Sequence, residues 1–102
     1  MLLQLAADGE PLLLEEREFR QFAVRLAGEW ARPLSVKELS SALGPLGLAE
    51  DSQLLWLNVR RLAMLGPDED EWRLRYYEMI EYAGSKGWLR NNGSEVRLHI
   101  AP

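Results

Sequence analysis

The strongest folding signal in the chain lies near its end, in Trp88-Leu89-Arg90-Asn91-Asn92-Gly93-Ser94-Glu95-Val96-Arg97-Leu98-His99-Ile100. Asn-Gly is a favoured hairpin turn because both residues tolerate positive φ angles. Counting outward from this turn pairs Arg90 with Glu95 and Leu89 with Val96, an opposite-charge pair and an apolar pair. The stretch therefore predicts a C-terminal β-hairpin whose inner face carries Val96, Leu98 and Ile100 and whose outer face carries Trp88, Arg97 and His99.

Upstream of this hairpin, apolar spacings of three and four residues predict four helices. Ser35 and Glu38 form a capping box that starts a short helix at 35–43, which Gly44-Pro45 ends. Pro67 and the four acids that follow it suit the first turn of a helix over about 67–86. The other two helices are expected at 15–31, where Trp30 joins the apolar stripe, and at 52–65.

The N-terminal residues 2–14 are expected to form a second hairpin. Asp8-Gly9 suits a two-residue turn, which would pair Leu5 with Leu12 and Leu3 with Leu14. A short apolar lead-in to the following helix is the competing interpretation. If both hairpins form, they are expected to join into one small sheet with the helices on its apolar face, because two strands alone are marginal.

The length indicates a single domain over residues 1–102. The four predicted helices, with β-hairpins at one or both termini, make its class α+β and mostly α. The 47% apolar fraction is sufficient for a core, and the absence of cysteine excludes disulfides and thiolate metal sites. Sixteen acidic residues against twelve basic ones give a net charge of −4. This balance favours a cytoplasmic protein and argues against nucleic acid as the main partner, since nucleic-acid affinity rests on concentrated Lys and Arg. The N-terminus predicts neither a signal peptide nor a membrane span.

No pattern typical of a catalytic, cofactor or metal site occurs in the sequence, so we expect no enzymatic activity, no cofactor and no metal. His99 is the only histidine, and we interpret it as a surface or interface residue, with proton transfer as the alternative. The four acids at 68–71 point about 100° apart along a helix and cannot converge on one cation. Gly84-Ser85-Lys86-Gly87 is interpreted as a helix end rather than a phosphate loop.

The helix 35–43, the helix 52–65 and the C-terminal hairpin together resemble a winged helix-turn-helix domain over about residues 15–100. In such domains the helix after the turn enters the major groove of DNA and the hairpin wing touches the backbone. The resemblance implies that 52–65 would be the recognition helix, and that Arg90 and Arg97 would lie on the wing. The exposed residues of the recognition helix would be Gln53, Asn58, Arg60 and Arg61.

The function expected from these patterns is a non-enzymatic protein–protein interaction or regulatory module, with a homodimer as one form of it. Trp56 and Trp88 are the tryptophans expected at an interface, because tryptophan is enriched at binding hot spots, and Trp88 could instead stack on Arg97. The alternatives are a winged-helix DNA-binding regulator and a small accessory subunit of an enzyme. The candidate interaction residues are Trp56, Trp88, Arg60, Arg61, Arg90, Arg97 and His99.

Overall fold

Seven short strands form two sheets in the computed structural model, which describes residues 1–101. The first sheet has three strands in the order β2-β1-β3. Its strands are β1 (Leu2–Ala6), β2 (Leu12–Leu14) and β3 (Ala23–Ala27). β1 pairs antiparallel with β2 and parallel with β3, so β1 is the central strand of this sheet.

The second sheet has four antiparallel strands in the order β4-β5-β7-β6. Its strands are β4 (Gly47–Ala49), β5 (Leu54–Asn58), β6 (Leu89–Arg90) and β7 (Glu95–His99). A single parallel bridge between Val24 and Ile100 joins the two sheets, and the N–H of Ala101 donates to the carbonyl of Val24 at 2.7 Å. The edge of β7 that faces away from β5 therefore pairs with β6 near the start of β7 and with β3 just beyond the end of β7.

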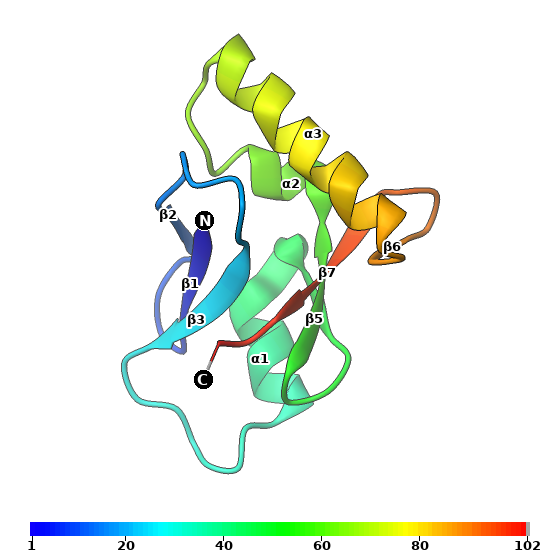
Figure 1. Cartoon of the computed structure of the whole chain (residues 1–102). Coiled ribbons are helices and arrows are strands. Elements are labelled where there is room, and N and C mark those ends of the chain that lie inside the picture. Colours follow the sequence, from blue (N-terminus) through cyan, green and yellow to red (C-terminus); the bar gives the residue numbers. More distant parts are fainter. Residues whose placement is uncertain (102) are drawn as a thin grey trace.

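Three α-helices and one 3₁₀ turn complete the fold: α1 (Val36–Leu43), η1 (Gly44–Leu46), α2 (Val59–Ala63) and α3 (Asp70–Ser85). β7 crosses in front of α1 in the view of Figure 1, and α3 runs above both sheets next to α2. No helix in the described part of the chain is long and apolar enough to cross a membrane.

One apolar core connects both sheets with the three helices. Leu3 and Leu5 from β1, and Leu55 and Leu57 from β5, are fully buried. The most voluminous of the fully buried side chains are Trp72 and Tyr76 on α3. The ring centroids of Trp72 and Tyr76 lie 5.2 Å apart in a stacked arrangement, so α3 is anchored by aromatic packing in its first two turns.

Three of the predicted elements are confirmed. The hydroxyl of Ser35 accepts a hydrogen bond from the N–H of Glu38 at 3.0 Å and caps α1, and α1 ends at Leu43. α3 buries Trp72, Tyr76, Ile80 and Ala83, as its apolar stripe predicts. The C-terminal hairpin has the predicted register, with Leu89 opposite Val96 and Arg90 opposite Glu95.

The predicted helix over 15–31 is wrong. Residues 15–22 form an irregular segment, and Ala23–Ala27 is β3. The apolar residues of this region fit a helical stripe, but Val24, Arg25 and Leu26 also alternate between buried and exposed positions, as a strand requires. The parallel partner β1, which is far away in the sequence, decides between the two patterns.

The predicted helix over 52–65 is also wrong. The winged-helix arrangement is therefore wrong as well, because it requires this helix as its recognition helix. Residues 54–58 are β5, the strand between β4 and β7, and the α2 helix begins only at Val59. A short apolar run such as 54–57 fits a buried strand as well as a buried helix. Asn58 caps α2 by accepting from the N–H of Arg61 at 2.8 Å, whereas Asp51 stabilises the turn before β5.

The fold is consequently α+β with helix and strand in similar amounts, rather than a mostly α domain of four helices. The N-terminal hairpin exists, but its register differs by one residue from the prediction: Leu3 lies opposite Leu13, and Gln4 opposite Leu12. A loop longer than two residues connects β1 and β2, and the shift leaves Leu12 52% exposed. The two hairpins do not join into one sheet, because β3 occupies the position between β1 and β7.

Candidate functional site

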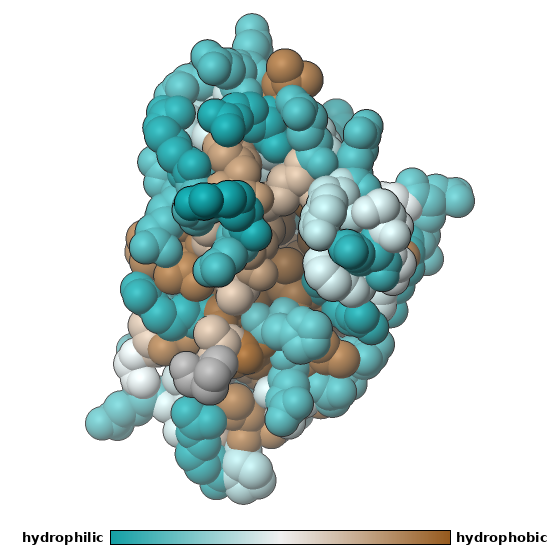
Figure 2. Space-filling view, in the orientation of Figure 1, coloured by the Kyte–Doolittle hydropathy of each residue, from teal (hydrophilic) through white to brown (hydrophobic). Residues whose placement is uncertain are grey.

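A groove of about 170 Å³ lies between α3, β7 and the irregular segment 15–22. We call it the α3–β7 groove, and residues 15–22 the wall segment. Its lining is mainly apolar and aromatic: Phe19, Phe22, Met79, Ile80, Tyr82, Ala83, Trp88, Val96 and Leu98. Four polar or basic side chains complete it: Arg20, Gln21, Arg97 and His99. Figure 2 shows apolar surface running down the middle of this face between polar flanks.

Within residues 1–101, β3 and β7 are joined by the Val24–Ile100 bridge, and residues 19–22 just before β3 line the groove opposite β7. β6 covers the start of the same edge of β7, where the N–H of Arg97 donates to the carbonyl of Trp88 at 2.8 Å. Among the described residues, no strand pairs with Leu98 or His99 on this edge. Side chains from both faces of β7 therefore reach the groove.

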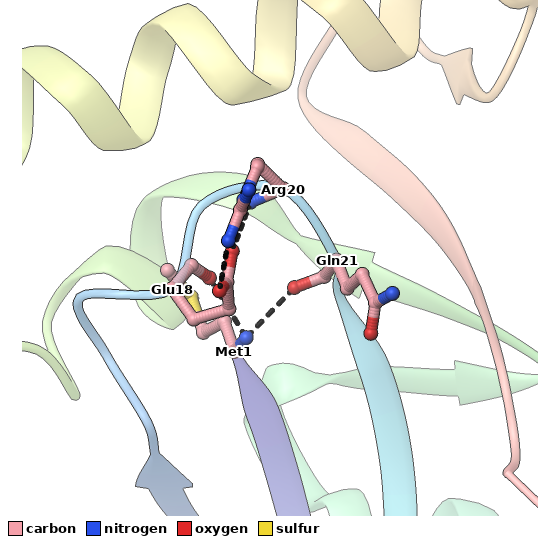
Figure 3. A network of polar contacts seen from close by, with 4 residues as sticks. All are labelled: Met1, Glu18, Arg20 and Gln21. Carbon is pink, nitrogen blue, oxygen red and sulfur yellow. Dashed lines mark hydrogen bonds and ion pairs between the residues drawn. The ribbon is translucent and has the colours of Figure 1, made fainter.

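The wall segment is held against the N-terminus of the chain (Figure 3). The ammonium group of Met1 donates to the carbonyl oxygen of Glu18 at 2.8 Å and to that of Gln21 at 2.7 Å. Partial burial lowers the pKa of this ammonium group, while the carboxylates of Glu15 and Glu18 oppose that shift. Arg20 donates to the Glu18 carboxylate at 3.3 Å, and this contact lowers the pKa of the Glu18 carboxyl.

The same segment is also anchored on α3. The indole N–H of Trp72 donates to the carbonyl of Glu16 at 2.7 Å, and Arg17 pairs with Glu69 at 2.8 Å. The ring of Phe19 lies 6.2 Å from that of Trp72. These contacts fix the wall segment from two sides although it contains no helix or strand.

The structure brings together three of the seven candidate interaction residues at this groove. Trp88 is 38% exposed, and His99 is exposed on β7. Arg97 is partly buried, and its Nε atom is buried without a hydrogen-bond partner in the described structure. An unpaired buried N–H costs stability, because its hydrogen bond to water is lost and is not replaced.

Two further candidates, Trp56 and Arg90, lie on the outer face of the second sheet. Trp56 is only 8% exposed, and its indole N–H donates to Glu50 at 2.8 Å. The guanidinium of Arg90 lies 4.2 Å above the Trp56 ring and also pairs with Glu95 at 3.2 Å. The cation–π contact found on this face thus joins Arg90 to Trp56, where the sequence suggested Trp88 and Arg97.

Arg60 and Arg61, the last two candidates, lie apart from the groove on α2. Both are exposed and border two shallow hollows around Met64, which is 78% exposed. They do not lie on a recognition helix, since that part of the chain contains only the five residues of α2. These two arginines are therefore a natural control surface for experiments on the groove.

Sequence reasoning missed the groove residues Phe19, Arg20, Phe22 and Met79, because it assigned them to helical stripes or left them out. Within residues 1–101 there is no cluster of three or more His, Asp or Glu side chains that could hold a metal ion. No protein-family model matches this chain, and neither a curated protein nor a solved structure matches it.

Proposed function

We propose that this chain is a non-enzymatic protein-interaction module that receives a large apolar side chain of its partner in the α3–β7 groove. The observation that carries the proposal is the lining of the groove, in which an apolar floor meets exposed Trp88 and Tyr82 and the partly buried Arg97. Tryptophan, tyrosine and arginine are the residue types most enriched at interface hot spots.

The size of the groove favours a side chain over a free small molecule. Sites for small molecules usually have volumes of roughly 300–1,000 Å³ and enclose most of the ligand. At about 170 Å³, the α3–β7 groove is smaller than this range and is open to solvent on one face. A single anchoring side chain presented by a folded or extended partner fits such a groove.

Selection from a random peptide library displayed on phage tests the proposal and does not require that the natural partner be identified first. Peptides enriched on the native chain should share one large apolar residue. Their affinity should fall about tenfold in Trp88→Ala, since truncating a hot-spot tryptophan typically costs more than about 1 kcal/mol. Fluorescence anisotropy of the selected peptides measures the change.

Leu74→Ala is the matched control variant, because Leu74 is 63% exposed on α3 and does not line the groove. Its affinity should equal that of the native chain, and the far-UV circular dichroism of both variants should be unchanged. Selected peptides that bind Trp88→Ala as tightly as the native chain would exclude the groove as the site. Sedimentation of the free chain at increasing concentration tests the alternative that a second copy occupies the groove.

A further inference from the structure

The basic side chains next to the groove continue beyond it into a second hollow. This hollow, of about 660 Å³, lies on the other side of the Val24–Ile100 bridge and contains Arg25, Arg32 and His99 in its lining. His99 lines both hollows, so they adjoin along the line where β3 meets β7. We call this line the seam.

The charge along the seam is opposite to that of the chain as a whole. Arg20, Arg25, Arg32, Arg97 and His99 line the two hollows, and no carboxylate side chain is among the described residues that line either of them. Arg20 pairs with Glu18, and Arg25 donates to the amide oxygen of Gln4, whereas Arg32 and Arg97 form no ion pair within residues 1–101. A chain of net charge −4 thus presents a basic line on one face.

The backbone of β7 adds a second requirement for whatever binds here. On this edge the N–H of Arg97 donates to Trp88 and the N–H of Ala101 donates to Val24. Because successive peptide groups of a strand point to opposite sides, the N–H of His99 points to the same edge, where no strand of the described structure pairs with it. One backbone carbonyl of a bound peptide can accept from this N–H, in the gap between Trp88 and Val24 on this edge.

We propose that the partner segment is an extended acidic peptide that lies along the seam. It hydrogen-bonds to the backbone of His99, places one apolar side chain in the α3–β7 groove and directs carboxylates to Arg97 and Arg32. This inference rests on the proposed function and adds the charge, the conformation and the path of the partner. The complementary charge selects an acidic segment, and the narrow apolar groove favours a peptide side chain over a nucleobase or a lipid.

A fluorescein-labelled decapeptide of Asp and Glu with one central Phe is the probe. Its binding to the full chain, measured by anisotropy, should weaken about tenfold when Arg32 and Arg97 are both replaced by Gln, because charge-assisted hydrogen bonds are lost. It should also weaken as salt is raised. The matched control replaces Arg60 and Arg61 by Gln, which removes the same charge from α2 and should leave the affinity unchanged.

Three variants of the probe separate the parts of the proposal. Replacement of the acids by Lys should abolish binding, and replacement of Phe by Ala should weaken it. Replacement of a peptide bond next to Phe by an alkene isostere should also weaken it, because the carbonyl that accepts from the His99 N–H is removed. Equal affinity of the Lys peptide overturns the acidic partner, and equal affinity of the alkene peptides overturns the backbone hydrogen bond to His99. A single-stranded DNA decamer tests nucleic acid as the partner. If this DNA displaces the peptide, and its own affinity falls about tenfold in the Arg32/Arg97 variant, nucleic acid replaces the acidic peptide as the proposed partner.

The result also distinguishes this inference from the function on which it rests. If peptides from the random library bind the groove through an apolar residue but carry no acids, and the acidic probe does not bind, the inference fails and the proposed function stands. If no peptide depends on Trp88, both fail. If the selected peptides are acidic and bind in the pattern described above, both are supported.

Discussion

At the scale of single residues, Tyr76 shows how much one buried polar group contributes. Its ring is fully buried, and its hydroxyl donates to the carbonyl of Val59 at 2.7 Å, which ties α3 to the start of α2. Burial raises the pKa of the Tyr76 phenol well above its ordinary value, and the neighbouring Tyr77 adds to this shift. The folded state therefore holds this proton more tightly than the unfolded state does.

This shift predicts a loss of stability at high pH. The contribution is present in full below the ordinary tyrosine pKa of about 10 and declines as pH rises above it, because only the unfolded state then releases the proton. Tyr76→Phe should cost about 0.5–1.5 kcal/mol at neutral pH, the value of one hydrogen bond. Urea unfolding from pH 8 to pH 11 should show the difference between native chain and variant shrinking above pH 10, and a constant difference would contradict the assignment.

At the scale of elements, the connection between α2 and α3 depends on Gly66. A Cβ atom at this position would lie 2.2 Å from the Trp72 ring, and Trp72 is fixed by its hydrogen bond to Glu16 and by its stacking on Tyr76. The Trp72 ring cannot move away, so there is no space for a side chain at residue 66.

Gly66→Ala is therefore expected to destabilise the fold by about 1–3 kcal/mol, the usual cost of overpacking a well-packed core. Gly9→Ala is the matched control, since a Cβ there meets only Ala6 at an ordinary 3.5 Å. Thermal unfolding followed by circular dichroism measures both variants. Equal midpoints for the two would show that Trp72 can move, contrary to the packing described above.

The elements also show which parts of the fold are predictable from sequence. Local signals specified α1, α3 and the C-terminal hairpin: a Ser35 cap, an apolar stripe and an Asn92-Gly93 turn. β3 and β5 were not predictable in this way, because their apolar residues suit helix or strand and distant partner strands make the choice. Strand alternation identified Trp88, Arg97 and His99 as surface groups. The groove is also lined by residues 19–22, and the position of this segment depends on contacts with residues more than fifty positions away in the sequence.

At the scale of the whole molecule, the two sheets share one bridge but a single core. The buried cluster includes Leu3 and Leu5 from the first sheet together with Leu55, Leu57 and Leu98 from the second. Because neither sheet could bury its apolar face alone, the two are expected to unfold together.

Chemical unfolding should therefore be one cooperative transition. Tryptophan fluorescence, to which Trp72 on α3 contributes, and far-UV circular dichroism, to which both sheets contribute, should give coincident curves in urea. Two separated transitions would show that the seam divides the chain into units that fold independently.

The hydrogen bonds of Met1 have a practical consequence for any affinity measured on this protein. Its ammonium group has three N–H donors, whereas the amide that replaces it after fusion to a tag has one. Such a fusion can keep at most one of the two hydrogen bonds to Glu18 and Gln21. Phe19 and Arg20, which line the groove, lie between these two residues in the chain. Expression design is thus part of the binding experiment, and a chain in which the Met1 ammonium group is free is the reference form for these measurements.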